Sequence, residues 1–279
     1  MFKLGFLANG EMLSWDYDKL FSFVKNAGYD CVELIGDVIF TREYKDLPKY
    51  EEKYGLKISE VLAQHDFVVT DEAEYKNSVD TVCEQIRKCA DIGVDTANLF
   101  TGPVPWNANP LIVGRGISQE KAWSLVLGAF DKVLKVAEER RVKIAVENVW
   151  GMLAHDFYTN KYLQSRFDSP YLGVNLDPSH DVLYGNTDMA FLVKSWGEKI
   201  FHVHIKDAVG VAAPGKFVFP LIGEGCVDFK TFFSTLKEIG YEGCASVEFE
   251  SWAYRNAAWH GEHAPAVAEM KKLIDLFIN

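Results

Sequence analysis

The stretch HVHIKDA, residues 202–208, places two histidines, a lysine and an aspartate in a segment that otherwise has the composition of a buried strand. It lies within one of eight short apolar, β-rich runs of the chain. The eight runs are FKLGFLA (2–8), CVELIG (31–36), KISEVLAQ (57–64), TANLFTG (96–102), KIAVENV (143–149), LGVNLD (172–177), IFHVHIKD (200–207) and CASVEFES (244–251). We expect each run to form a strand.

Helix-like stretches separate these runs, with apolar residues at i, i+3 and i+4, most clearly at 121–141 and 229–240. Several end in a glycine before the next strand, as in NAGYD, DIGVD and EIGYE, which is typical of a left-handed helix C-cap. Eight strand–helix alternations without a dividing linker favour one (β/α)8 TIM barrel, a single domain over residues 1–279. A Rossmann-like sheet is the alternative, but LANGEM after the first strand supplies one glycine where that fold needs a glycine-rich turn.

Composition limits the classes of partner. The 279-residue chain is 48% hydrophobic and 25% charged, which is typical of a globular protein. Its net charge of -11 argues against nucleic acids and anionic membranes as partners, because both require a basic surface. No apolar run approaches the roughly 20 residues of a membrane helix, and the N-terminus does not resemble a signal peptide. Five cysteines without a CxxC pair indicate reduced thiols, so we expect a cytoplasmic protein.

The last four predicted strands each carry a polar residue near the carboxyl end, where barrel enzymes place their catalytic groups. These residues are Glu147, Asp177, His204 and Glu248. Three carboxylates this close together would repel one another or take up protons unless a cation lay between them. The sequence therefore predicts a divalent metal ion, and this donor set suits Mn²⁺, Mg²⁺ or Co²⁺ better than a structural zinc. Glu250 shares a strand face with Glu248 and is the rival ligand.

Other polar and aromatic residues are candidates for substrate binding. His180 follows Asp177 by three residues, and Lys206 lies beyond His204 on the same strand face. Their structural alternatives are a backbone hydrogen bond for His180 and an ion pair with a neighbouring acid for Lys206, while His202 is expected to be a core residue. The long segments 101–116 and 208–225 are expected to form pocket walls. Further candidates for sugar contacts are Glu33, Gln64, His65, Trp106 and Trp150.

The series VEN, NLDPSH, HVHIKD, PLIGEGCVDF and GYEGCASVEFE resembles the xylose-isomerase-like TIM-barrel superfamily, the group of sugar phosphate isomerases and epimerases that includes ketose 3-epimerases, inosose dehydratases and endonuclease IV. The resemblance covers the whole chain in strand order. It implies one Mn²⁺, Mg²⁺ or Co²⁺ held by Glu147, Asp177, His204 and Glu248, a substrate-facing His180, and the two glutamates as an acid/base pair. It also implies a homo-oligomer.

Two departures from that family are visible. The segment before Gly223 reads KFVFPLI and offers none of the additional ligands of the trinuclear zinc site in endonuclease IV. Ketose 3-epimerases also carry an arginine soon after the strand-seven histidine, where this chain has residues 207–210, Asp-Ala-Val-Gly. The first departure excludes DNA repair, and the second leaves the reaction open.

The functional hypothesis is a metal-dependent isomerase or epimerase that deprotonates a ketose or keto-sugar next to its carbonyl and forms an enediolate. A lyase that eliminates a β-substituent from a keto-sugar, keto-inositol or keto-glycoside shares the same first steps and is the first alternative. A non-catalytic sugar-binding barrel, or a subunit of a larger complex, is the second alternative.

Overall fold

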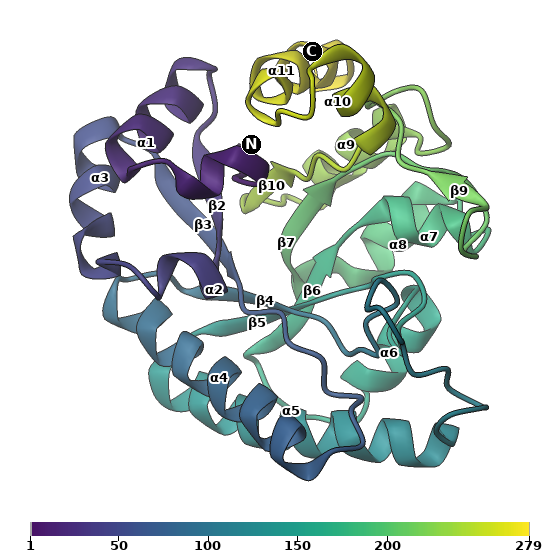
Figure 1. The fold of residues 1–279 in the computed structure, drawn as a ribbon. Coiled ribbons are helices and arrows are strands. Elements are labelled where there is room, and N and C mark those ends of the chain that lie inside the picture. The colour runs from purple at the N-terminus through teal and green to yellow at the C-terminus, as the bar shows by residue number, and fades with distance from the viewer. Residues whose placement is uncertain (1, 279) are drawn as a thin grey trace.

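The computed structural model describes residues 2–278, and they form a closed barrel of eight parallel strands inside a ring of helices (Figure 1). The barrel strands, in chain order, are β1 (Lys3–Leu7), β2 (Cys31–Ile35), β3 (Lys57–Leu62), β4 (Thr96–Leu99), β5 (Lys143–Glu147), β6 (Leu172–Leu176), β7 (Ile200–Ile205) and β10 (Cys244–Val247). Neighbouring strands pair in sequence order, and β1 pairs with β10 to close the barrel. All eight predicted strands and the (β/α)8 TIM barrel are confirmed.

The longer helices cover the outer face of the strands, and short helices also follow directly on some of the strand ends (Figure 1). They are α1 (Tyr17–Asn26), α2 (Gly36–Ile39), α3 (Leu47–Tyr54), α4 (Glu72–Asp91), α5 (Gln119–Arg140), α6 (Phe157–Gln164), α7 (Pro178–Leu183), α8 (Met189–Trp196), α9 (Phe229–Glu238), α10 (Trp252–Ala258) and α11 (Ala264–Ile278), with short 3₁₀ turns at Gly10–Ser14, Tyr44–Asp46 and Gly197–Lys199. The predicted helices at 121–141 and 229–240 correspond to α5 and α9. Gly93 and Gly240 follow α4 and α9 with φ of +78° and +72°, so the predicted left-handed positions are confirmed there.

Alternation along each strand separates two environments. On β2, Val32 and Leu34 belong to the hydrophobic core, whereas Glu33 between them contacts His204 on the inside of the barrel. Large side chains such as Phe21 and Phe130 are completely buried in that core, and each contributes about 1.5–3 kcal/mol of hydrophobic stabilisation. The outer layer thus stabilises the barrel, while the inside is free to hold polar groups.

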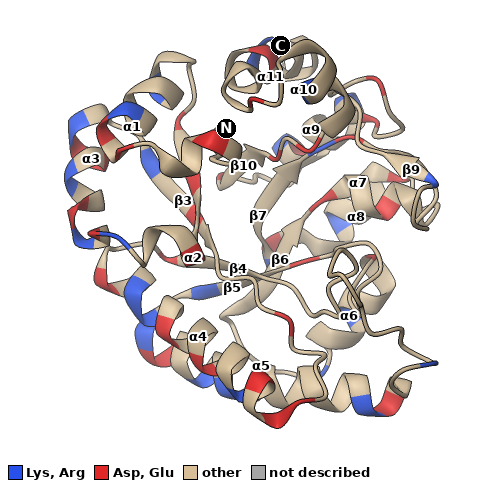
Figure 2. Cartoon of the chain, viewed as in Figure 1, with Lys and Arg blue, Asp and Glu red and all other residues tan. Residues whose placement is uncertain are grey.

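The outer surface shows no basic face in the view of Figure 2, where charges of both signs alternate along α1, α3, α4 and α5. Among the described residues, no helix combines the length and apolar character needed to span a membrane. All five cysteines, which the structure describes, are free.

Candidate metal centre

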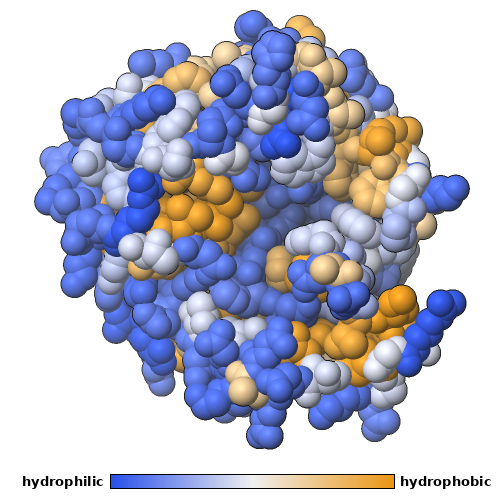
Figure 3. Space-filling view, viewed as in Figure 1, coloured by the Kyte–Doolittle hydropathy of each residue, from blue (hydrophilic) through white to orange (hydrophobic). Residues whose placement is uncertain are grey.

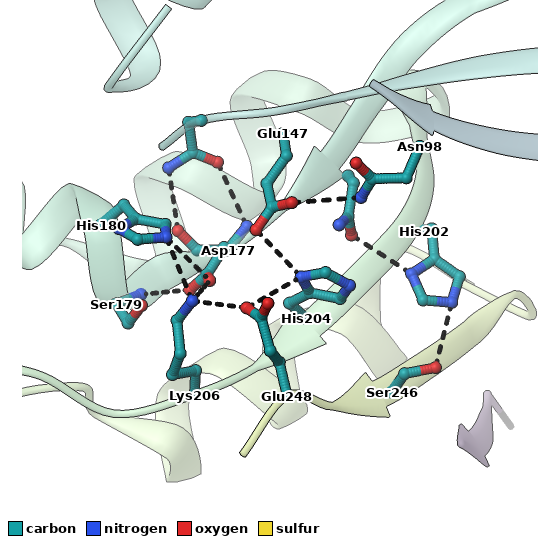
Figure 4. Close-up of polar contacts among 12 residues, drawn as sticks. Asn98, Glu147, Asp177, Ser179, His180, His202, His204, Lys206, Ser246 and Glu248 are labelled. Carbon is teal, nitrogen blue, oxygen red and sulfur yellow. Dashed lines mark hydrogen bonds and ion pairs between the residues drawn. The ribbon is translucent and has the colours of Figure 1, made fainter. Parts of the chain in front are cut away.

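The four predicted ligands come together at the carboxyl end of the barrel (Figure 4). Glu147 is the last residue of β5, Asp177 directly follows β6, His204 lies in β7 and Glu248 directly follows β10. One potential ligand atom from each lies within 4.8 Å of those of the other three. His204 Nδ1 is 3.0 Å from Glu147 Oε1 and 3.3 Å from Glu248 Oε2. Four successive strands therefore supply one compact donor group.

Lys206 currently balances the charge of this donor group. Its Nζ atom lies 3.0 Å from Asp177 Oδ2, 2.5 Å from Glu248 Oε2 and 3.0 Å from Glu250 Oε2. The lysine side chain is 3% exposed, so these ion pairs are largely shielded from water. An ammonium group thus stands among the same carboxylates that a divalent cation would use. Glu250 lies outside the four-residue donor group, and this arrangement favours Glu248 as the ligand.

The donor chemistry fits a divalent cation. Within residues 2–278, Asp177 Oδ2 is buried without a hydrogen-bond partner, although the Lys206 ammonium lies at ion-pair distance. Three carboxylates and one imidazole, without a thiolate, match the preferences of Mn²⁺, Mg²⁺ and Co²⁺ better than those of a structural zinc site. A cation here would compensate carboxylates that now depend on Lys206 and His204. The predicted metal site is therefore compatible with the residues present.

The electrostatic environment shifts the pKa values of Glu147 and Glu248 in opposite directions. Burial raises the pKa of Glu147. Burial acts in the same direction on Glu248, but the positive charges of Lys206 and His204 outweigh it and lower the pKa of that carboxyl. His204 is buried too, yet Glu33, Glu147 and Glu248 hold its pKa well above the usual range. Burial and the charge of Lys206 lower the pKa of His180 to about 3, so this imidazole is neutral.

Neighbouring amides fix the ligand positions. Glu147 Oε2 accepts hydrogen bonds from Gln64 Nε2 at 2.8 Å and from Asn98 Nδ2 at 3.3 Å, which leaves Oε1 facing His204. Asn148 Nδ2 donates to the Asp177 carbonyl, and its Oδ1 accepts from the Asp177 amide. Asn148 therefore clamps the end of β6, where the ligand Asp177 is presented.

Glu33 lies beneath the donor group. Its carboxylate is completely buried, and Oε1 is 2.9 Å from His204 Nε2. Glu33 does not line the cavity where a sugar hydroxyl was predicted to contact it, because β2 directs this residue to the far side of the His204 ring. The arrangement is that of a carboxylate that orients a metal-binding histidine by accepting its second N–H.

A second acidic group extends deeper into the barrel. Glu33, Glu60, His202 and His204 also place potential ligand atoms within 4.8 Å of one another. In the described chain, Glu33 Oε2 and Glu60 Oε1 are buried without hydrogen-bond partners. All four side chains are 0–1% exposed, whereas Glu147 and Glu248 of the donor group line the open cavity. A metal ion that enters from the cavity therefore reaches the donor group of Glu147, Asp177, His204 and Glu248 more easily than this deeper group, which favours the donor group as the metal site.

Replacement of Glu33 tests its orienting role. Glu33→Gln is expected to weaken metal binding about 10–100-fold, the usual effect of losing a carboxylate behind a ligating histidine. Glu60→Gln is the matched control, because burial and the charge of Glu33 raise the pKa of Glu60 well above its usual value and a neutral amide mimics the protonated carboxyl. Calorimetric titration with Mn²⁺ measures both affinities. Equal losses in the two variants would contradict a specific role for Glu33.

The donor group lies at the floor of a cavity of about 740 Å³. The cavity wall includes five of the predicted substrate residues, which are Gln64, Trp106, Trp150, His180 and Lys206. His65 does not reach it, and its Nε2 atom instead lies 2.9 Å from Asp37 Oδ1. The structure therefore does not bring His65 to the cavity where a sugar contact was predicted, because its side chain pairs with Asp37 of α2.

A roof segment, defined as residues 208–225, covers one side of the cavity and contains the hairpin of β8 (Val209–Gly210) and β9 (Phe217–Val218). Asp207 holds this segment at its base. Its carboxylate accepts backbone hydrogen bonds from Ala208, Gly223, Gly225 and Val227 at 2.8–3.0 Å. The predicted pocket wall at 208–225 thus depends on a single buried carboxylate.

Asp207→Ala is expected to lower the free energy of unfolding by about 3 kcal/mol or more, because several donors lose a charged acceptor at once. The matched control is Asp228→Ala. That exposed residue caps α9 through Thr231 N at 3.0 Å, and loss of such a cap costs about 1 kcal/mol. Urea denaturation monitored by circular dichroism gives both values. A similar, small loss in both variants would show that Asp207 does not hold the roof segment.

Several site residues were not predicted from the sequence. Asn98 and Glu60 both face the barrel interior and contact one another at 3.4 Å, and neither was singled out. The signal that could have found them is a polar side chain within a buried β-rich run, as in TANLF and KISEV. That rule also identifies His202, whose Nδ1 lies 3.1 Å from Glu60 Oε2, as part of the interior network.

Comparison with known proteins agrees with the fold. A family model described as xylose isomerase-like TIM barrel matches residues 21–276. An inosose dehydratase of Clostridium beijerinckii is 29% identical over 157 residues, which cover 50% of this chain and 51% of that protein. The chain thus spans about half the length of this curated relative.

Solved structures of similar fold cover nearly the whole chain. The IolI protein with a bound zinc atom aligns with a TM-score of 0.74 and 22% identity over 99% of both chains. The 3-keto-D-glucoside 4-epimerase YcjR from E. coli aligns with a TM-score of 0.78 and 14% identity, also over 99% of both chains. At these identities the likeness shows the fold alone. The match over residues 21–276 and the closed barrel establish that the chain belongs to the xylose isomerase-like TIM barrel family.

Proposed function

We propose that the chain is a divalent-metal-dependent isomerase or epimerase that removes a proton next to the carbonyl group of a ketose or keto-sugar. The observation that carries this proposal is the donor group of Glu147, Asp177, His204 and Glu248 at the floor of an open cavity. These residues offer both ligands for a cation and carboxylates that reach the cavity. Mn²⁺ is the proposed ion because hard oxygen donors predominate.

A divalent ion bound by these residues would polarise a substrate carbonyl and make the adjacent C–H bond more acidic. The chain supplies the proton acceptor and donor. Glu147 and Glu248 both line the cavity and both approach His204 Nδ1, and one carboxylate oxygen of each lies within 4.8 Å of the other. One glutamate removes the proton and the other returns one, each working as a general acid or base.

His180 and Lys206 are proposed to bind substrate oxygens. Both line the cavity, and His180 Nε2 lies 3.1 Å from Lys206 Nζ. A divalent cation held by Asp177 and Glu248 would compensate their charge and would leave the Lys206 ammonium available to a substrate oxygen. The sequence left an ion pair and a substrate contact as alternatives for Lys206. We propose that Lys206 forms the ion pair in the metal-free protein and the substrate contact when the metal is bound.

A lyase is the second candidate. The observation that favours it is the 29% identity to an inosose dehydratase, a match that covers half of this chain. In that reaction one glutamate would remove the same proton, and the other would donate a proton to the departing β-substituent instead of returning one to carbon. In addition, ketose 3-epimerases carry an arginine soon after the histidine of the seventh barrel strand, where this chain has residues 207–210. Asp207 uses its carboxylate to hold the roof segment, so residues 207–210 offer no basic side chain to a ketose.

The test is proton exchange in D₂O, followed by NMR, with Mn²⁺-loaded protein and a panel of ketoses, keto-inositols and keto-glycosides. We expect exchange at the carbon next to the carbonyl for at least one compound, and loss of exchange when EDTA removes the ion. The product then separates epimerisation, isomerisation and elimination. Ligand binding that persists in EDTA without exchange would instead support a non-catalytic sugar-binding barrel.

A further inference from the structure

The cavity has two chemically different parts (Figure 3), a hydrophilic floor and hydrophobic walls over the ends of β2 and β3 and beside β9. The polar lining groups are concentrated around the donor group and include Glu147, His180, Lys206, Glu248 and Glu250. The apolar lining residues are Leu7, Ile35, Leu62, Phe100, Trp106, Val149, Trp150, Phe217, Val218, Phe219, Trp252 and Ala253. Nine of these nineteen lining residues have no side-chain hydrogen-bonding group, and each of the three tryptophans offers only an indole N–H.

The aromatic wall continues directly from the floor. Phe219 lies with its ring centroid 4.8 Å from Lys206 Nζ and 5.6 Å from the His180 ring. Phe217 packs against Phe219 at 5.2 Å and against Trp150 at 4.7 Å. A ligand bound beside Lys206 and His180 would therefore have this aromatic surface as its neighbour.

Cavity size indicates a substrate larger than one sugar ring. The volume of about 740 Å³ falls within the range of roughly 300–1,000 Å³ that is typical of sites for drug-sized ligands. A single ring bound at the floor would leave the aromatic wall in contact with water. Trp106, 58% exposed, and Trp252, 44% exposed, add further aromatic surface to the cavity lining. Exposed apolar surface beside a polar floor is typical of a ligand-binding groove.

The charges of the lining oppose a phosphorylated substrate. Of the cavity-lining residues in the described chain, Lys206 alone is a lysine or arginine, and three carboxylates already surround its ammonium. Glu147, Glu248 and Glu250 would repel a phosphate dianion unless several cations faced it. An uncharged apolar group matches the outer wall better than a phosphate or a second, hydroxyl-rich sugar does.

We propose that the substrate is an unphosphorylated glycoside whose sugar ring binds at the floor and whose flat, apolar aglycone packs against the aromatic wall. This inference rests on the proposed function and narrows its substrate class from ketoses in general to keto-glycosides with an aromatic aglycone. Stacking and burial of such a group on Trp106, Trp150 and Phe217 provide the additional affinity.

The test is isothermal titration calorimetry of Mn²⁺-loaded protein with unreactive analogues. The probes are the phenyl and methyl glycosides of glucose and galactose in both anomeric forms, cellobiose and glucose 6-phosphate. At least one phenyl glycoside is expected to bind about tenfold or more tightly than its methyl counterpart. Trp106→Ala, which replaces an exposed side chain and therefore preserves the fold, is expected to remove most of that difference.

Tyr158→Ala is the matched control, because this aromatic residue of α6 is 60% exposed and does not line the cavity. It is expected to leave both affinities unchanged. Failure of every phenyl glycoside to bind more tightly than its methyl partner, or tighter binding of cellobiose or glucose 6-phosphate, would overturn the inference. The D₂O experiment separates this failure from that of the proposed function. If an unsubstituted ketose exchanges its proton but no phenyl glycoside binds preferentially, the aromatic aglycone is rejected and the proposed catalytic function stands. If a phenyl glycoside binds preferentially but no keto-glycoside exchanges its proton, the proposed catalytic function is rejected.

Discussion

Glu147→Gln and Glu248→Gln are each expected to slow solvent exchange at the carbon next to the substrate carbonyl about 10²–10⁴-fold, the usual contribution of a general acid or base. Glutamine keeps an oxygen that can face a cation but cannot accept the proton. Both side chains lie at the cavity floor and approach His204 Nδ1 at 3.0 and 3.3 Å, so each is within reach of the same bound substrate. NMR in D₂O measures the exchange rate.

Two controls keep this prediction specific. Glu198→Gln changes an exposed glutamate outside the cavity and is expected to exchange at the unaltered rate. Elemental analysis of each purified variant shows whether the ion is retained, which separates loss of a base from loss of the metal. Unchanged exchange in both Glu147→Gln and Glu248→Gln would exclude this acid/base pair.

Lys206→Met is expected to destabilise the metal-free protein by about 3–5 kcal/mol, the usual effect of removing one partner from a buried ion pair. Asp177, Glu248 and Glu250 would then share a largely buried region without their ammonium counter-charge. Excess Mn²⁺ is expected to recover much of this loss, because the ion replaces the missing positive charge and stabilises the folded state by mass action. Urea denaturation in EDTA and in Mn²⁺ measures the difference.

Lys194→Met is the matched control. Lys194 pairs with Glu238 at 2.8 Å, but its side chain is 50% exposed, and exposed pairs contribute at most about 1 kcal/mol. A loss in Lys206→Met that is equally small, or one that Mn²⁺ does not reduce, would show that the ammonium and the ion do not act on the same carboxylates.

The sequence predicted the barrel because its signals are local. Each strand is a short β-rich run, and glycines such as Gly93 mark helix ends through a backbone conformation that other residues rarely adopt. The donor group was predictable for a related reason. Glu147, Asp177, His204 and Glu248 all stand at the carboxyl ends of consecutive strands, and a parallel barrel brings those ends together.

The depth of a residue inside the barrel was not predictable in the same way. Glu33 was expected to contact a sugar, but the pairing of β2 with β3 shifts register next to this residue, and its carboxylate lies below His204. His65 follows a strand as the ligands do, yet pairs with Asp37 outside the cavity. Such outcomes depend on strand register and side-chain direction across the barrel, which no single run of sequence contains.

The most direct test of the metal centre is a crystal structure of protein soaked in Mn²⁺, with anomalous diffraction used to locate the ion. The structure predicts one anomalous peak, surrounded by Glu147, Asp177, His204 and Glu248, with Lys206 displaced from Asp177 and Glu248. A peak among Glu33, Glu60 and His202, or no peak at a saturating Mn²⁺ concentration, would contradict the proposed centre.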